Sequence, residues 1–183
     1  MAISFRTYAQ LALEDAEGRW ELMGGHPRRK PPESFQHGAL IDGLIEQLVP
    51  LLRGSDYRLS VNHARLMIDQ DHILLPDLAV VPRAVSARAV RERPNALETY
   101  HTSLPLLIDV WTPATAEFNV EARIPEYRRA NAEEIWLVHP AARAVTVWVR
   151  RTGGAYQEAI RVAGTLTAVR VPGLALDITA LFS

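Results

Sequence analysis

The chain has 183 residues, of which 48% are hydrophobic and 22% charged, and its formal net charge is −1. This size and composition are typical of an ordinary globular domain, so residues 1–183 are expected to form a single domain. Cysteine is absent, which excludes disulfides and thiolate metal sites, and the near-neutral charge does not by itself indicate a nucleic-acid-binding protein.

The sequence has no N-terminal signal segment and no apolar run of about 20 residues, so we expect a cytoplasmic protein without a membrane partner. Lysine and arginine together number 20, and Lys30 is the one lysine, so the other 19 are arginines. A GC-rich coding bias is the simplest explanation of this ratio. Any mechanism that requires a lysine must therefore use Lys30 or replace it with an arginine.

The first third of the chain predicts a short helix at 5–12, a hairpin whose first strand carries Glu21, and a long helix at 35–52. The long helix is predicted because its apolar residues recur at helical spacing: Leu40, Ile41, Leu44, Ile45, Leu48, Leu51 and Leu52. His37 lies near its first turn. A histidine at such a position is more often solvated or capping than catalytic.

Two apolar stretches in the middle of the chain each carry one acid. Residues 73–81 predict a strand with Asp77, and residues 104–111 predict a strand with Asp109. Both are nearly continuous runs of Leu, Ile and Val, which is typical of strands buried on both faces. An unpaired buried carboxylate loses much of its hydration energy, so two such acids suggest a shared cation.

Four arginines lie in the segment 82–97, between the two acid-bearing strands. They are Arg83, Arg88, Arg91 and Arg93. We expect a mobile or weakly helical surface segment, interpreted either as a solvated loop or as a flap that contacts phosphates, and the arginines alone do not decide. After the second acid, residues 119–131 predict a helix with Arg123 and Tyr127, although Pro125 inside it conflicts with regular helix. Further strands are predicted at 57–61, 63–69, 134–139, 144–150, 156–162 and 166–169, and a closing helix at 178–182.

Asp77 and Asp109 are candidate ligands of a divalent metal for phosphodiester hydrolysis. That reaction needs a cation to neutralise charge on the phosphoryl oxygens and to lower the pKa of a water molecule. Mg²⁺ prefers oxygen ligands, so the two carboxylates and the Val110 carbonyl would suffice. A nearby basic group, here on the helix with Arg123, then stabilises the transition state. The alternatives are that Pro76-Asp77 caps a turn and that Asp109 pairs with a core arginine.

The order of several short motifs carries a resemblance to a known family. They are WELMGG at 20–25, PDLAVV at 76–81, LIDVWTPAT at 107–115, YRRA at 127–130, EIWLV at 134–138 and VPGLALD at 171–177. In this order and spacing, over nearly its whole length, the chain resembles the Uma family of putative restriction endonucleases, within the PD-(D/E)xK nuclease superfamily.

The resemblance implies an α+β fold of the restriction-endonuclease type, in which a mixed sheet is flanked by helices and the metal acids lie at one edge. It implies that Asp77 and Asp109 bind Mg²⁺ or Mn²⁺ and that Glu21 and His37 are auxiliary residues of the active site. The implied substrate is DNA, and a homodimer would suit the cleavage of both strands of a duplex.

Four positions depart from the pattern of this family. Asp109 stands where the family usually has Glu, and Asn119 stands where it usually has Asp. The family's lysine lies on the helix at the position of Arg123, four residues before the tyrosine, while Trp111 occupies the strand position. Arginine keeps the positive charge but cannot lose its proton to act as a base. Lys30 would take this role only if its hairpin lay over the site.

The sequence therefore supports three hypotheses. The first is a Mg²⁺-dependent DNA endonuclease with a partly altered active site, whose activity is weak or absent. The second is a catalytically inactive nucleic-acid-binding or assembly module that keeps the nuclease fold. The third is a structural domain in which Asp77, Asp109 and Arg123 form a buried ion-pair cluster.

Overall fold

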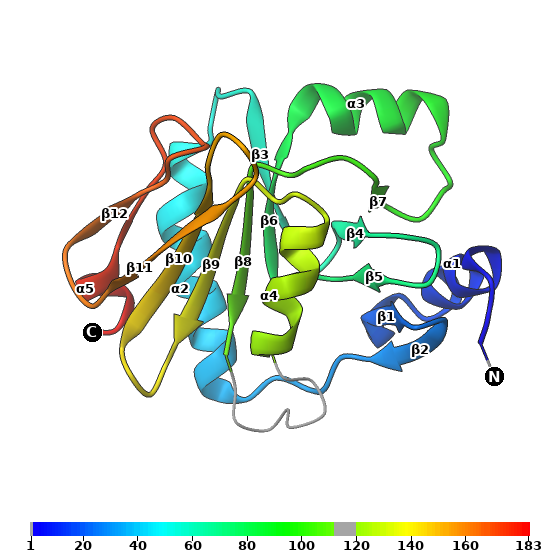
Figure 1. Ribbon diagram of the computed structural model, residues 1–183, viewed down its shortest axis with the longest axis horizontal. Coiled ribbons are helices and arrows are strands. Elements are labelled where there is room, and N and C mark those ends of the chain that lie inside the picture. The colour runs from blue at the N-terminus through cyan, green and yellow to red at the C-terminus, as the bar shows by residue number, and fades with distance from the viewer. Residues whose placement is uncertain (1, 112–119) are drawn as a thin grey trace.

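The computed structural model describes residues 2–111 and 120–183. Within these residues, most strands belong to two mixed sheets (Figure 1). The larger sheet has the order β11-β10-β9-β8-β6-β3 and contains β3 (Tyr57–Val61), β6 (Leu78–Pro82), β8 (Leu106–Val110), β9 (Glu134–His139), β10 (Ala144–Arg150) and β11 (Tyr156–Arg161). In this sheet β8 and β9 are parallel, and the other neighbouring strands are antiparallel.

Two helices cover opposite faces of the larger sheet (Figure 1). α2 (Phe35–Leu51) packs on the face that carries Ile108, and α4 (Val120–Arg129) packs on the face that carries Leu107. Side chains alternate between the two faces of a strand, so Asp109 of β8 points toward α4. The predicted mixed sheet flanked by helices is confirmed.

α2 forms where the apolar spacing predicts a helix. The Ser34 side chain caps it by accepting a hydrogen bond from the His37 N–H, which satisfies one of the free donors of the first turn. Most of the predicted stripe is buried against the sheet, including Leu40, Ile41, Leu44 and Leu48, whereas Leu51 is exposed. This packing fixes the first turn of the helix, and His37 with it.

The smaller sheet lies toward the N-terminal side of the molecule (Figure 1). It has the order β2-β1-β5-β4-β7 and contains β1 (Trp20–Met23), β2 (His26–Arg29), β4 (Arg65–Met67), β5 (Ile73–Leu74) and β7 (Thr99–Tyr100). β1 and β2 form the predicted hairpin, in which Gly24 and Gly25 adopt φ of 58° and 75°. Glycine reaches these left-handed angles without steric cost. α1 (Phe5–Glu14) and a 3₁₀ turn (Ala16–Gly18) precede the hairpin.

The single strand predicted around Asp77 is wrong, because the structure divides it between the two sheets. β5 pairs with β1 and β4, whereas β6 pairs with β3 and β8. Pro76, between them, has no N–H to donate. The N–H groups of Leu75 and Asp77 donate to the carboxylates of Glu21 and Asp109, at 2.6 and 2.9 Å. Acidic side chains therefore hold the backbone where it crosses from one sheet to the other.

The segment with four arginines is a surface helix, α3 (Arg83–Glu92), and none of its residues is buried. The chain ends with β12 (Thr165–Thr167), β13 (Ala175–Asp177) and α5 (Ile178–Leu181), of which β13 was not predicted. In the described ranges, no helix has both the length and the apolarity needed to cross a membrane.

Candidate active site

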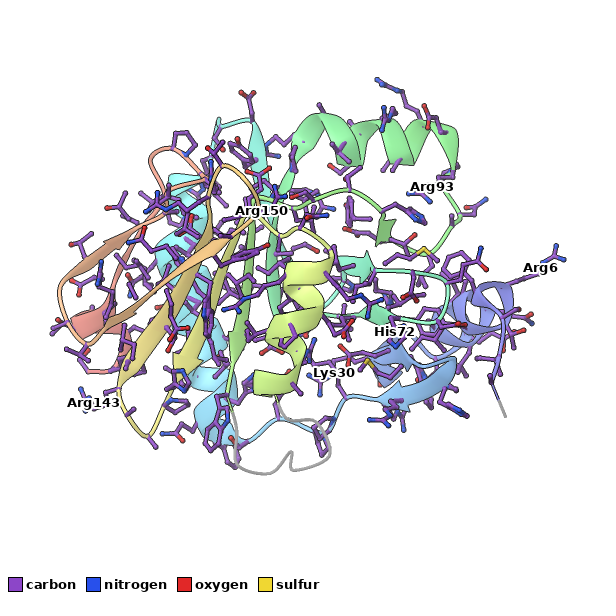
Figure 2. All side chains as sticks on the ribbon, in the orientation of Figure 1. Arg6, Lys30, His72, Arg93, Arg143 and Arg150 are labelled. Carbon is purple, nitrogen blue, oxygen red and sulfur yellow. The ribbon has the colours of Figure 1, made fainter. Side chains whose placement is uncertain are left out.

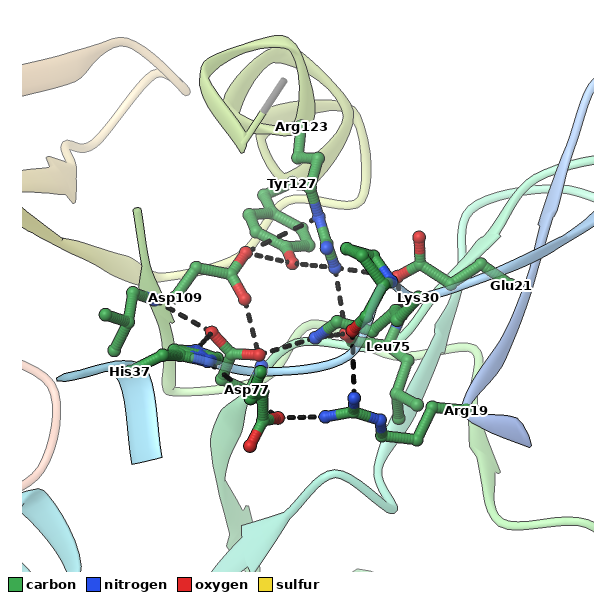
Figure 3. A network of polar contacts seen from close by, with 12 residues as sticks. Arg19, Glu21, Lys30, His37, Leu75, Asp77, Asp109, Arg123 and Tyr127 are labelled. Carbon is green, nitrogen blue, oxygen red and sulfur yellow. Dashed lines mark hydrogen bonds and ion pairs between the residues drawn. The ribbon is translucent and has the colours of Figure 1, made fainter. Parts of the chain in front are cut away.

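Asp77 and Asp109 meet at one end of the larger sheet. Asp77 directly precedes β6 and Asp109 lies in β8, and Leu78 faces Ile108 across this antiparallel pair. The Asp77 N–H donates to Asp109 Oδ1 at 2.9 Å, and the Val110 N–H donates to Asp77 Oδ2 at 2.8 Å (Figure 3). β6 and β8 are interior strands, so the acids lie at a strand end rather than on an edge strand of the sheet.

Arg123 reaches these acids from α4 (Figure 3). Its Nη2 donates to Glu21 Oε1 at 2.7 Å and to the Leu75 carbonyl oxygen at 2.8 Å, and its Nε lies 3.5 Å from Asp109 Oδ2. Burial would lower the pKa of Arg123, but Asp109 and Glu21 raise it well above its usual value. The guanidinium therefore stays charged and joins Glu21 of the smaller sheet to Asp109 of the larger one.

Glu21 and Tyr127 complete the surroundings of Arg123. The Tyr127 hydroxyl donates to Asp109 Oδ2 at 2.6 Å and accepts from Arg123 Nη2 at 2.8 Å. Burial raises the pKa of Tyr127 well above its ordinary value, so the hydroxyl remains a donor at neutral pH. Burial also raises the pKa of Glu21, and the nearby Arg123 opposes this effect only in part.

Lys30 lies in the site although sequence reasoning did not place it there. It directly follows β2, and its Nζ lies 2.5 Å from Asp77 Oδ1 and 3.0 Å from the Leu75 carbonyl oxygen. Its side chain is only 8% exposed. Burial would raise the pKa of Asp77, but the Lys30 ammonium and the Val110 hydrogen bond outweigh it and hold that pKa below its usual range. The available signals were that Lys30 is the single lysine and that it follows the Glu21 hairpin.

His37 contacts Asp77 from the start of α2. Its Nε2 lies 3.1 Å from Asp77 Oδ2, and its Nδ1 lies 3.9 Å from Glu33 Oε1, beyond hydrogen-bonding distance. The buried Nδ1 has no hydrogen-bond partner among the described residues. Arg19 in turn forms an ion pair with Glu33 (Figure 3). Glu33 is a second site residue that the sequence did not indicate.

The donor chemistry of the site suits a divalent metal. Glu33, His37 and Asp77 each offer one ligand atom within 4.8 Å of the others, and carboxylate and imidazole groups are common ligands of divalent ions. Asp77 belongs to this group and to the ligand set expected from the sequence. Asp109 lies beside it, but its oxygens accept hydrogen bonds from the Asp77 N–H and the Tyr127 hydroxyl.

The structure thus brings together the five side chains that the sequence singles out: Glu21, His37, Asp77, Asp109 and Arg123. Val110 takes part through its N–H, which binds Asp77. Trp111 packs at the border of the core between α4 and the sheet. Asn119, where the sequence departs from the family pattern, lies outside the described residues.

Comparison with known proteins gives one family and one solved structure of interest. The model of the family described as "Uma2: Putative restriction endonuclease" matches residues 5–180. A crystal structure from Anabaena variabilis ATCC 29413, described as a putative nuclease belonging to DUF820, has a TM-score of 0.73 and 19% sequence identity, and the match covers 98% of this chain and 97% of that one. Such a likeness shows a shared fold. Among curated proteins, none matches this sequence.

Proposed function

Because this chain belongs to the Uma2 family of putative restriction endonucleases, we propose that it is an endonuclease that hydrolyses DNA phosphodiesters with the help of Mg²⁺ or Mn²⁺. The observation that carries this proposal is the convergence of Asp77 and Asp109 from neighbouring strands, with a buried cation beside each. Buried acids and bases gathered at one strand end are typical of a catalytic site rather than of a core.

In the proposed reaction, the oxygen of a water molecule bonds to phosphorus and the ester P–O bond breaks. The water gives up one proton, and the leaving oxygen takes up one. The metal, when bound, neutralises charge on the phosphate and lowers the pKa of that water. Asp77, Asp109 and the Val110 carbonyl would hold it. Tyr127 and Arg123 keep the Asp109 carboxylate in place through its Oδ2.

His37 and Glu21 act as auxiliary residues in this proposal. His37 contacts Asp77 Oδ2 and restricts the rotation of that carboxylate. Glu21 binds both Arg123 and the Leu75 N–H, so it fixes the backbone just before Asp77. Both residues therefore position a group that would contact the metal or the phosphate.

Plasmid cleavage tests the proposal. The wild-type protein with Mn²⁺ should convert supercoiled plasmid DNA to nicked or linear DNA, and Asp77→Ala should lower this rate by about 100-fold or more. Asp42→Ala is the matched control, because Asp42 is an exposed acid of α2. Cleavage by Asp77→Ala at the wild-type rate would contradict the proposal, as would intact plasmid with the wild-type protein at every metal and pH.

A second candidate function is an inactive nucleic-acid-binding module. It is favoured by one observation: each carboxylate oxygen of Asp77 and Asp109 already contacts a donor of the protein. Arg123→Lys separates the two candidates. A gain of metal-dependent cleavage in this variant would mean that the scaffold is competent and that arginine limits it. Retained DNA binding without cleavage in both proteins would favour the binding module.

Calorimetric titration with Mn²⁺ identifies the metal ligands. If Asp77, Asp109 and the Val110 carbonyl hold the ion, Asp109→Asn should weaken binding by about tenfold or more, and Glu33→Gln should bind like the wild type. The reverse result would assign the ion to the group of Glu33, His37 and Asp77. Unchanged binding in both variants would place the ion elsewhere.

The proposal also includes the location and the assembly of the protein. We propose that the protein is cytoplasmic, and that it is a homodimer, because cleavage of both strands suits two-fold symmetry. Sedimentation with and without duplex DNA tests the assembly. A protein that stays monomeric on DNA would limit the activity to nicking one strand at a time.

A further inference from the structure

We propose that Lys30 is the catalytic cation of this site, which contacts a non-bridging oxygen of the scissile phosphate. This inference rests on the nuclease function proposed above. Lys30 is the single lysine of a chain in which all other basic residues apart from histidine are arginines. It lies 2.5 Å from Asp77, with a side chain that is only 8% exposed.

Lys30 and Arg123 approach the same point from different elements. Lys30 comes from the end of the β1–β2 hairpin and Arg123 from α4, and both donate to the Leu75 carbonyl oxygen, at 3.0 and 2.8 Å (Figure 3). The charged groups of Lys30 and Arg123 therefore lie close to the same carbonyl oxygen, although their backbones belong to different elements. Lys30, which directly follows this hairpin, therefore reaches Asp77, as this role requires.

The hydrogen bonds of the two cations distinguish their roles. An ammonium group has three N–H donors. The described residues give Lys30 two acceptors, Asp77 Oδ1 and the Leu75 carbonyl oxygen, which leaves one donor for a phosphate oxygen. Arg123 uses its Nη2 to contact Glu21, the Leu75 carbonyl and Tyr127, while its buried Nε, 3.5 Å from Asp109 Oδ2, has no hydrogen-bond partner among the described residues. Because its Nη2 contacts join groups from three different parts of the chain, we assign Arg123 a positioning role.

The chemistry of the reaction favours a lysine at this place. Negative charge grows on the phosphoryl oxygens in the transition state, and a compact ammonium in a largely buried site stabilises it without reorganisation. Lys30 already neutralises Asp77, so its charge is oriented before the substrate arrives. No proton has to leave Lys30 in this role, and the proton balance of the hydrolysis is unchanged.

Cleavage by three variants of the site and one control variant tests this assignment. Lys30→Met should lower the cleavage rate at saturating DNA by about 100-fold. Lys30→Arg keeps the positive charge beside Asp77, so a lower rate in this variant is not explained by misfolding. We expect its rate to fall by about tenfold, because the planar guanidinium is bulkier than an ammonium. Arg6→Met is the control, since Arg6 extends away from the molecule on α1 (Figure 2). The double variant Lys30→Met with Arg123→Lys should cleave about tenfold faster than Lys30→Met alone, because a lysine at position 123 of α4 then supplies an ammonium group to the site.

A spectroscopic readout keeps the test independent of turnover. Lysine labelled with ¹³C at Cε gives one side-chain resonance in this protein, because Lys30 is its one lysine. A short DNA duplex added with Ca²⁺, at concentrations that saturate binding, should shift this resonance. The Asp42→Ala protein should show the same shift.

The outcomes separate this inference from the proposed function. If the wild type cleaves and Asp77→Ala does not, but Lys30→Met cleaves at the wild-type rate, the nuclease function stands and the role of Lys30 is wrong. A Lys30 resonance that stays in place while DNA saturates the protein also overturns the assignment, whether or not the wild type cleaves. A plasmid left intact by the wild type contradicts the nuclease function itself.

Discussion

At the scale of single residues, the site is a balance of buried charges. Glu21, Asp77 and Asp109 bring three carboxylates, and Lys30 and Arg123 bring two cations. Buried charges are costly unless each is paired and hydrogen-bonded. The pKa of Asp77 is lowered because an ammonium and a backbone N–H bind it, while burial raises the pKa of Glu21, which shares its guanidinium with Asp109. Removing one member should therefore disturb its neighbours.

Tyr127→Phe tests this coupling. Loss of the hydroxyl leaves Asp109 Oδ2 without its 2.6 Å donor, so we expect the free energy of unfolding to fall by about 1 to 3 kcal/mol. Urea denaturation measures the change. Tyr57→Phe is the control, because no residue in the described part of the chain forms a hydrogen bond with the Tyr57 hydroxyl, and it should change stability by less than about 0.5 kcal/mol. Equal stability of the two variants would show that the Tyr127 hydroxyl does not support the site.

A second residue-scale prediction concerns Tyr8 and alkaline pH. Burial raises the pKa of Tyr8 from 10.0 to about 12, and its hydroxyl donates to the Trp20 carbonyl at 2.7 Å. The folded protein holds this proton more tightly than the unfolded chain does. Its contribution to stability is therefore intact below about pH 10 and falls as the pH rises, by about 2 kcal/mol near pH 12.

Urea unfolding of the wild type and of Tyr8→Phe across this pH range checks the sign. The wild type should lose stability more steeply than Tyr8→Phe above about pH 10. Tyr100 also has its pKa raised to about 12 by burial, so some loss should remain in the variant. Parallel curves for the two proteins would mean that the Tyr8 proton is not held by the fold.

The sequence located most of the acids of the site but not all of its residues. Asp77 and Asp109 stood out because an acid in an apolar run is unusual, and the structure joins them through backbone hydrogen bonds. Lys30 and Glu33 lie in the polar linker between β2 and α2, where no periodicity indicates which way a side chain points. Their place depends on tertiary packing, which local sequence patterns do not encode.

At the scale of elements, the start of α2 controls the geometry around Asp77. Ser34 caps the helix through the His37 N–H, and the next residues bury the apolar stripe. The cap and the stripe together decide where the His37 imidazole lies. This helix was predictable because its capping residue and apolar spacing agree.

Ser34→Ala tests the cap. We expect a loss of about 1 kcal/mol in the free energy of unfolding, because one N–H of the first turn loses its acceptor. Ser86→Ala is the control, since Ser86 is a half-buried serine of α3 whose hydroxyl donates to the Arg83 carbonyl within the same helix. Chemical denaturation compares the two. The prediction fails if Ser34→Ala is no less stable than Ser86→Ala.

The break between β5 and β6 shows what apolar patterns miss. The residues around Asp77 are nearly all apolar and buried, so they read as one strand. The structure interrupts them because Pro76 cannot donate and because Glu21, far away in sequence, captures the Leu75 N–H at 2.6 Å. Pro76 is a local sign of the break, but the acceptor of the Leu75 N–H comes from another element, and no local pattern indicates it.

At the scale of the whole molecule, the two sheets share a core as well as the site. Leu66 and Leu74 of the smaller sheet belong to the same buried cluster as Leu107 and Leu137 of the larger one. Glu21 and Arg123 add a buried ion pair across the same boundary. We therefore propose that residues 1–183 fold as one cooperative unit.

Single-tryptophan variants test this cooperativity. Trp20 reports on the smaller sheet and Trp136 on the larger one. In each of two variants that keep one of them, the fluorescence transition in urea should coincide with the far-UV circular dichroism transition of the same protein. Separate midpoints for the two signals within one variant would show that the sheets unfold independently.

The crossing at Leu75, Pro76 and Asp77 has a mechanical consequence. This short linker carries the Leu75 carbonyl oxygen, which accepts hydrogen bonds from Lys30 and Arg123, and the Asp77 carboxylate, which Lys30 binds. A metal ion or phosphate bound among these groups would therefore link the smaller and the larger sheet. Its binding should slow proteolytic cleavage at distant loops of both sheets at once, although it contacts none of these loops.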